Sequence, residues 1–144
     1  MAATWEGGYR ASMDVRGHKL VADEPESAGG GDTGPQPSEF LLAALASCFT
    51  LAIYHVARKR DIELDDLSVT ATGTYEGPKF AHLSLTVTSA TARDVLGPLV
   101  ERAKGVCYVS NTLRAVSDVE VIVADPAAPG EPAQPSGFVP PLSI

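Results

Sequence analysis

The chain has 144 residues, which is enough for one domain and too few for a separate cofactor-binding domain. Its 18 acidic and 11 basic residues give a net charge of −7, which argues against nucleic acid or an anionic membrane surface as the main partner. Two cysteines are too few for a disulfide scaffold or a four-cysteine zinc site, and the polar start carries no secretory signal. We therefore expect a cytoplasmic globular protein, a compartment in which a thiol pair is more often chemical than structural.

The N-terminal segment has the pattern of strands followed by a loop. Alternating residues from Trp5 to Val15 and the segment 18–23 predict two strands, joined by a turn at Arg16 and Gly17. Residues 24–37 are rich in glycine and proline and predict a loop. These glycines do not form a Walker-type phosphate loop, because no Gly-Lys-Ser/Thr follows them.

Residues 38–60 predict a long helix. Pro37 suits its first turn, Glu39 complements the helix dipole, and no charged residue occurs from position 40 to position 57. That length is marginal for a membrane span, but the serine, threonine, tyrosine, histidine and many alanines in the run argue against one. A helix that is apolar on nearly all sides needs burial all round. One chain of this size cannot supply it, so we expect a second subunit to cover part of the helix.

A hairpin and two helical segments are predicted next. Residues 67–76 and 81–89 alternate with period two around Gly77 and Pro78, which indicates a hairpin with Val69, Ala71, Leu83, Leu85 and Val87 on one face. Residues 91–104 predict an amphipathic helix with Val95, Leu96, Leu99, Val100 and Ala103 inward. Gly97 and Pro98 weaken or kink its middle.

The C-terminal part of the chain changes character. Gly105 is placed to cap the amphipathic helix, a short helical turn is predicted from Cys107 to Leu113, and 116–123 predicts a last strand. We therefore expect one domain over 1–124. Six of the eleven prolines fall in 125–144, which predicts a proline-rich tail. The tail is either a flexible extension or an arm that docks Phe138, Val139 and Leu142 on a neighbouring subunit.

The two cysteines can be interpreted in two ways. Cys48 lies in the middle of the apolar helix, and a free cysteine there is commonly just a small buried hydrophobe. Apolar surroundings raise a thiol pKa, so reactivity requires a cation from outside this helix. His55 lies about 10 Å farther along the axis and is not a direct partner. For Cys107, the free N–H groups of the helical turn that starts there would stabilise a thiolate, or the side chain is again a small buried residue.

Two motifs resemble those of a known family. Residues 34–48 (GPQPSEFLLAALASC) resemble the first-cysteine motif of the OsmC/Ohr family of osmotically inducible and organic hydroperoxide resistance proteins. Residues 106–113 (VCYVSNTL) resemble its second-cysteine motif, and the order of elements agrees from about residue 5 to residue 124. The resemblance implies an α+β fold in an intertwined homodimer, in which the long helix of each subunit is buried centrally against antiparallel sheet.

The same resemblance implies a thiol peroxidase. Cys48 would be the peroxidatic thiol that reduces an organic hydroperoxide to an alcohol, and Cys107 the resolving thiol. An external dithiol of the lipoyl type would restore both. The family activates its first cysteine with an arginine, for which we choose Arg10 ahead of Arg16 and Arg114.

The family also uses an acid, and here the pattern departs. In peroxidase members the glutamate directly follows the proline of the motif, where this chain has Ser38 and places Glu39 one residue later. Glu39 precedes Cys48 by nine residues, about 180° round a helix, so it cannot simply replace the missing acid. It is either a first-turn partner of the helix dipole or, as the remaining nearby acid, the candidate acid of the site.

Two functions are therefore open. One is the peroxidase, with Cys48, Cys107, Arg10 and Glu39 as its catalytic residues. The other is a non-peroxidase protein that binds a small apolar ligand at the dimer interface. We expect no metal and no cofactor, because the three histidines are scattered without ligand spacing.

Overall fold

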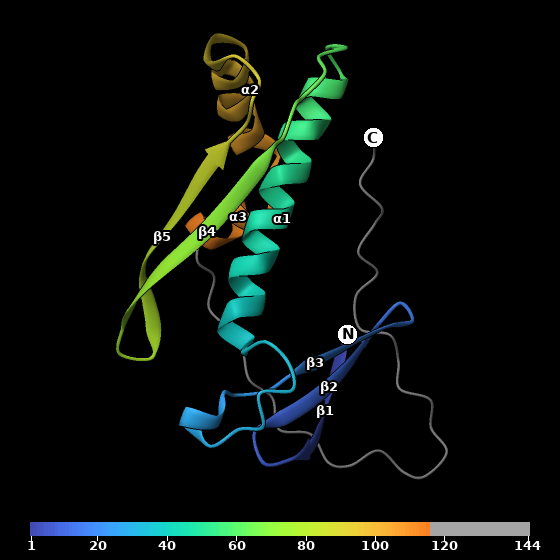
Figure 1. The fold of residues 1–144 in the computed structure, drawn as a ribbon, viewed down its shortest axis with the longest axis vertical. Helices are drawn as coiled ribbons and strands as arrows, with labels where there is room; N and C mark the ends of the chain where they lie inside the picture. The colour runs from blue at the N-terminus through green and yellow to red at the C-terminus, as the bar shows by residue number, and fades with distance from the viewer. Residues whose placement is uncertain (116–144) are drawn as a thin grey trace. The chain divides into compact units, whose positions relative to one another are not determined.

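The computed structural model describes residues 1–115, which divide into two compact units (Figure 1). The N-terminal unit comprises residues 1–36, and the helical unit comprises the described residues from Pro37 onward. The predicted strand at 116–123 and the proline-rich tail lie outside the described residues, together with the division of the chain at residue 124. The described elements combine antiparallel strands with helices, so the predicted α+β class is confirmed.

The N-terminal unit is a three-stranded antiparallel sheet in the order β1-β2-β3. Its strands are β1 (Ala2–Gly7), β2 (Arg10–Val15) and β3 (His18–Ala22). The sequence predicted two strands here, and that was wrong, because Gly7 and Gly8 have φ angles of 105° and 53° and split the first segment with a turn. The predicted turn at Arg16 and Gly17 is confirmed, and the amide of Gly17 donates to the Asp14 side chain at 2.8 Å.

A buried carboxylate orders the glycine-rich loop after β3. Asp23 is only 2% exposed and accepts hydrogen bonds from the Thr33 amide at 3.1 Å, the Thr33 hydroxyl at 2.7 Å and the Gly31 amide at 3.3 Å. The Thr33 hydrogen bond and the loop amides hold the pKa of Asp23 below its ordinary value. The predicted loop is therefore confirmed, and within it a short 3₁₀ turn spans Glu26–Ala28.

The long helix α1 spans Pro37–Arg58, with Glu39 in its first turn and Arg58 in its last. One face is buried within the chain, formed by Leu45, Phe49, Ala52, Ile53, Val56 and Ala57. The opposite face is not, since Leu51 is 61% and Tyr54 is 54% exposed. The burial all round that the sequence predicted is thus not reached within residues 1–115. Among residues 1–115, α1 alone has the length and hydropathy to cross a membrane, two properties that core helices share.

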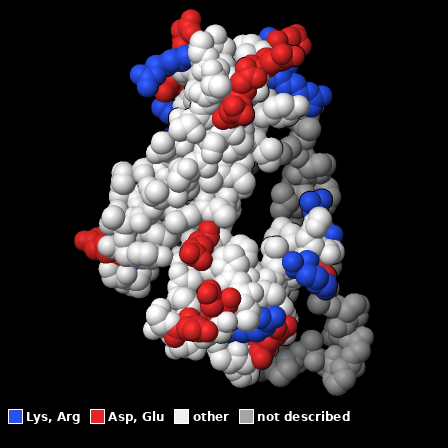
Figure 2. Space-filling model, viewed as in Figure 1, with Lys and Arg blue, Asp and Glu red and all other residues white. Residues whose placement is uncertain are grey.

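The hairpin pairs β4 (Ser68–Glu76) with β5 (Lys79–Thr88), as predicted. Val69 faces Val87, Ala71 faces Leu85 and Gly73 faces Leu83, so the apolar side chains share one face of the sheet. Figure 2 shows a broad uncharged surface over this hairpin, with acidic and basic side chains gathered where α1 ends. Helix α1 packs against β4, which places the hairpin beside the core of the helical unit.

Two further helices close the unit: α2 (Arg93–Val106) and α3 (Tyr108–Ala115). Helix α2 continues through Pro98, and Leu99 and Ala103 are buried as predicted. Gly105 does not cap it; that prediction was wrong, because the helix runs on to Val106 and Cys107 is the extended residue that ends it. The core joins one face of α1 to α2 and Cys107, and the partly buried Val69, Leu85 and Val87 of the hairpin pack against it.

Candidate active site

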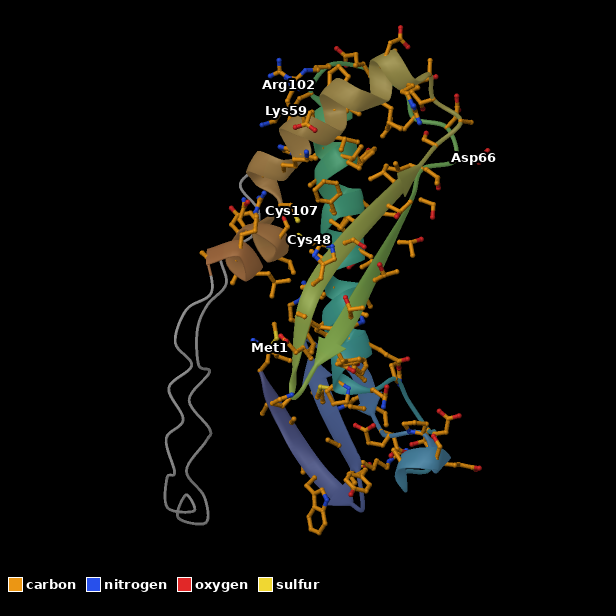
Figure 3. All side chains as sticks on the ribbon, turned by 90° about the vertical axis from the view of Figure 1, so that its left-hand side faces the viewer. Met1, Cys48, Lys59, Asp66, Arg102 and Cys107 are labelled. Atoms are coloured by element: carbon orange, nitrogen blue, oxygen red, sulfur yellow. The ribbon has the colours of Figure 1, made fainter. Side chains whose placement is uncertain are left out.

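The two cysteines meet inside the helical unit. Cys107 donates a hydrogen bond to the sulfur of Cys48 with a sulfur to sulfur distance of 3.4 Å, although the residues are 59 positions apart. Both are free thiols; Cys107 is fully buried and Cys48 is half-buried. Figure 3 shows the pair side by side, midway along α1 and beside the junction of α2 and α3. A disulfide bond is about 2.05 Å long, so a shift of little more than 1 Å would join them.

The break between α2 and α3 positions Cys107. Its amide donates to the Ala103 carbonyl at 3.0 Å, as the last bond of α2, and its carbonyl accepts the Asn111 amide at 3.1 Å, as the first bond of α3. The Ser110 hydroxyl donates to the same carbonyl at 3.3 Å. Cys107 is thus fixed at both ends by helical hydrogen bonds, with its side chain in the core.

Burial and neighbouring groups act in opposite directions on Cys48. Burial raises the pKa of its thiol above the ordinary value, and the contact with Cys107 raises it further. Backbone hydrogen bonds from Val109 and Tyr108 oppose that change. Within the described residues, no cation is among the groups that set this pKa. The expectation that an apolar helix raises the pKa of Cys48 is confirmed, and the first-turn amides of α3 act against that rise.

The candidate arginines have partners of their own. Arg10 lies in the N-terminal unit, where it donates to Glu6 at 2.8 Å and to the Thr33 hydroxyl. Arg16 lies in the β2–β3 turn of the same unit. Arg114 donates to the Lys104 carbonyl at 2.9 Å and to the Asn111 side chain, so it ties α3 to the end of α2. The assignment of Arg10 as the activating cation stays a prediction.

The candidate acid lies at the start of α1. Glu39 is exposed in the first turn, nine residues before Cys48 and about 13.5 Å along the axis at the standard helical rise. Ser38, at the position of the family's acid, accepts a hydrogen bond from the Tyr75 hydroxyl at 2.8 Å. Tyr75 in turn stacks on Phe80, with ring centroids 4.6 Å apart. Sequence reasoning missed this contact, because no local pattern links position 38 to a residue 37 positions later.

An apolar groove of about 520 Å³ lies in the same unit, and neither cysteine is among its lining residues. Its apolar lining includes Leu45 and Phe49 of α1, Leu83 and Leu85 of β5, Val100 of α2 and Leu113 of α3. Lys104 and Arg114 also line it and add positive charge. No group of three or more histidine, cysteine, aspartate or glutamate side chains in the described part of the chain could hold a metal ion.

Comparison with known proteins extends these observations. Residues 29–122 match the family model described as OsmC-like protein. A putative organic hydroperoxide resistance protein from Vibrio cholerae, with captopril bound in one of its active sites, is 32% identical. The alignment covers 78% of this chain and 83% of that one, with a TM-score of 0.59.

Two other solved structures are similar. An organic hydroperoxide resistance protein from Legionella pneumophila is 28% identical over 78% of this chain and 88% of that one, with a TM-score of 0.58. An OsmC-like protein from Mycoplasma pneumoniae, at 18% identity, shares the fold over 80% of this chain and 86% of that one, with a TM-score of 0.69. No curated protein sequence matches the chain. The family model alone covers well over half of the residues, and the chain belongs to the OsmC-like protein family.

Proposed function

We propose that this protein is a thiol-dependent peroxidase that reduces organic hydroperoxides to alcohols in defence against oxidative stress. The observation that carries the proposal is the 3.4 Å contact between two free thiols from α1 and the α2–α3 junction. The organic hydroperoxide resistance proteins among its structural relatives support the same chemistry. A purely structural cysteine would not require a second thiol at its side.

The reaction follows from the pair. The Cys48 thiolate attacks one oxygen of the O–O bond and becomes a sulfenic acid, while the other oxygen takes a proton and leaves as the alcohol. The Cys107 sulfur then displaces the sulfenic oxygen as water and forms a disulfide with Cys48. An external dithiol, for which we propose a lipoyl-type group, reduces the disulfide by thiol exchange and is itself oxidised.

Activation of Cys48 requires positive charge, because burial alone raises the pKa of its thiol. We assign that role to Arg10, and we propose that Glu39 is the first-turn partner of the α1 dipole. We further propose a homodimer in which a second copy covers the exposed Leu51 and Tyr54 face of α1. A reducing cytoplasm suits a protein whose two thiols must be returned to the free state.

Turnover of cumene hydroperoxide with a dithiol reductant tests the proposal. Wild type should consume peroxide catalytically, and Cys48→Ser should lose all turnover above the uncatalysed rate. Cys107→Ser should still form one sulfenic acid per chain, trapped by dimedone, because only the resolving step is lost. Ser47→Ala is the matched control: Ser47 precedes Cys48 on α1, and its hydroxyl donates only to the Ala44 carbonyl. Equal rates for wild type and Cys48→Ser would contradict the peroxidase.

The groove supports a second candidate function, the binding of a small apolar ligand without peroxidase chemistry. Its lining is mainly apolar, and Ser38 occupies the position of the family's acid. A hydrophobic fluorescent probe should then bind wild type and Cys48→Ser equally, and Val100→Asp should weaken binding at least tenfold. Probe binding together with absent peroxide turnover would favour this second function over the first.

A further inference from the structure

The first turn of α3 has free hydrogen-bond donors directly beside the cysteine pair. Helix α3 begins at Tyr108, and its first intrahelical bond runs from the Asn111 amide to the Cys107 carbonyl at 3.1 Å. The amides that precede Asn111 in this turn therefore have no partner within the helix. Cys107 is the residue immediately before the helix, and its sulfur lies 3.4 Å from that of Cys48. The positive end of α3 is thus brought to Cys48 from outside α1.

We propose that the backbone amides of Val109 and Tyr108 hold the Cys48 thiolate, so that the helix carrying the resolving thiol also activates the peroxidatic thiol. The inference rests on the proposed function in one respect, namely that the thiolate of Cys48 is the reacting species. The N-terminus of a helix carries about half a positive charge, which stabilises a nearby thiolate. This contribution needs neither an arginine nor an acid after the motif proline.

The electrostatics of Cys48 agree with this geometry. Burial raises the pKa of the Cys48 thiol, and hydrogen bonds from Val109 and Tyr108 lower it in part. The sequence assigned these amides to Cys107, on whose carboxyl side they lie. Their effect falls on the pKa of the other cysteine, Cys48, whose sulfur contacts that of Cys107 at 3.4 Å. Formation of the disulfide would remove the anion that these amides stabilise, so reduced Cys48 is the state they favour.

Proline substitution can remove one amide at a time. Proline is tolerated in the first turn of a helix, where its missing N–H has no intrahelical partner. The background is Cys107→Ala, because a serine at that position would itself accept the first-turn amides. In that background, Val109→Pro is compared with Val109→Ala, which keeps the amide and loses the same branched side chain. Tyr108→Pro and Tyr108→Ala form the second matched pair at the most proline-tolerant position.

The readout is the pH dependence of Cys48 alkylation by iodoacetamide, which reports the thiol pKa without any peroxide. Val109→Pro should raise that pKa by about one unit relative to Val109→Ala, a tenfold loss of thiolate at neutral pH. Tyr108→Pro should move it in the same direction, and this pair decides the result if Val109→Pro does not fold. The inference would be overturned if, in a matched pair that folds, the proline variant and the alanine variant had the same Cys48 pKa.

The same experiment separates this inference from the proposed function. Cumene hydroperoxide turnover is measured on wild type, with both cysteines present. A proline-dependent shift of the Cys48 pKa in a protein that turns over no peroxide would refute the peroxidase. The α3 amides would then still be hydrogen-bond donors to the Cys48 thiolate. Peroxide turnover with no proline-dependent shift would refute the role of the amides and support the peroxidase.

Discussion

Oxidation of the cysteine pair should stabilise the protein strongly. If the proposed function holds, one equivalent of an organic hydroperoxide per chain should convert the two thiols, whose sulfurs are 3.4 Å apart, into a disulfide within the helical unit. The link closes a loop of 59 positions and thereby reduces the conformational freedom of the unfolded chain. Because the sulfurs already lie in contact, the folded chain needs little rearrangement to form the bond.

The magnitude follows from the loop length. Closing a loop of this size removes about 14 cal/mol/K of entropy from the unfolded chain, which is about 4 kcal/mol at 25 °C. With a urea dependence of about 2 kcal/mol per molar, the midpoint of unfolding should rise by about 2 M. Strain in the folded state would make the rise in the urea midpoint smaller, and a rise of about 1 M would still agree with the stabilisation by a disulfide.

Urea unfolding of the reduced and the oxidised protein, followed by circular dichroism, measures the difference. Cys107→Ser treated in the same way is the control, and its midpoint should not rise, because no intramolecular disulfide can form. An oxidised wild type with an unchanged or lower midpoint would refute the reasoning, since it would mean that the sulfurs are not placed for bonding within one chain.

Three further predictions concern pH and packing. Because the pKa of Cys48 is raised above the ordinary value of 9.0, its stabilising contribution is complete below that pH and is lost as the pH rises through the folded-state pKa. The difference in unfolding free energy between the reduced wild type and Cys48→Ala should therefore shrink between pH 8 and pH 11, and a difference that grows would contradict the assignment. The pKa of Asp23 is lowered, so the loop that it anchors should stay ordered above its ordinary value of 3.8 and loosen as the pH falls through the folded-state pKa, with hydrogen exchange at Gly31 as the measurement. Leu99→Ala should lower the unfolding free energy by about 3 kcal/mol, because Leu99 is 1% exposed. Val106 lies on the same helix and is 44% exposed, so Val106→Ala should change the unfolding free energy by less than about 0.5 kcal/mol. Equal effects of the two substitutions would contradict the core described above.

Local patterns were enough to predict most of the helical unit. The uncharged run between Glu39 and Arg58 predicted α1, and the alternation around Gly77 and Pro78 predicted the hairpin with its apolar face. These features are encoded by neighbours in sequence, through helix dipole, turn preference and side-chain periodicity. The α+β class followed from the same patterns and from the resemblance to the family.

The sequence analysis was wrong at two places where glycines allow more than one local conformation. Gly7 and Gly8 could have signalled a turn, but the alternation on either side of them favoured a continuous strand. Gly105 suits a helix cap by composition, yet α2 gains another residue of helix before Cys107 ends it.

The site depended on contacts that no local pattern contains. The motifs identified Cys48 and Cys107, but their 3.4 Å separation results from the way α1 packs against α2 and α3. The same packing places the start of α3 where its backbone hydrogen bonds lower the pKa of Cys48. The hydrogen bond from Tyr75 to Ser38 likewise joins residues 37 positions apart. Helix packing, rather than sequence spacing, therefore determines the chemistry available to the thiols.

Cys48 and Cys107 are proposed to form one redox pair within a chain. Its most direct test is mass spectrometry of the protein after one equivalent of cumene hydroperoxide, with free thiols alkylated before digestion. We expect a Cys48–Cys107 disulfide within the same chain and one equivalent of alcohol released. Two alkylated cysteines with the peroxide unconsumed would contradict it.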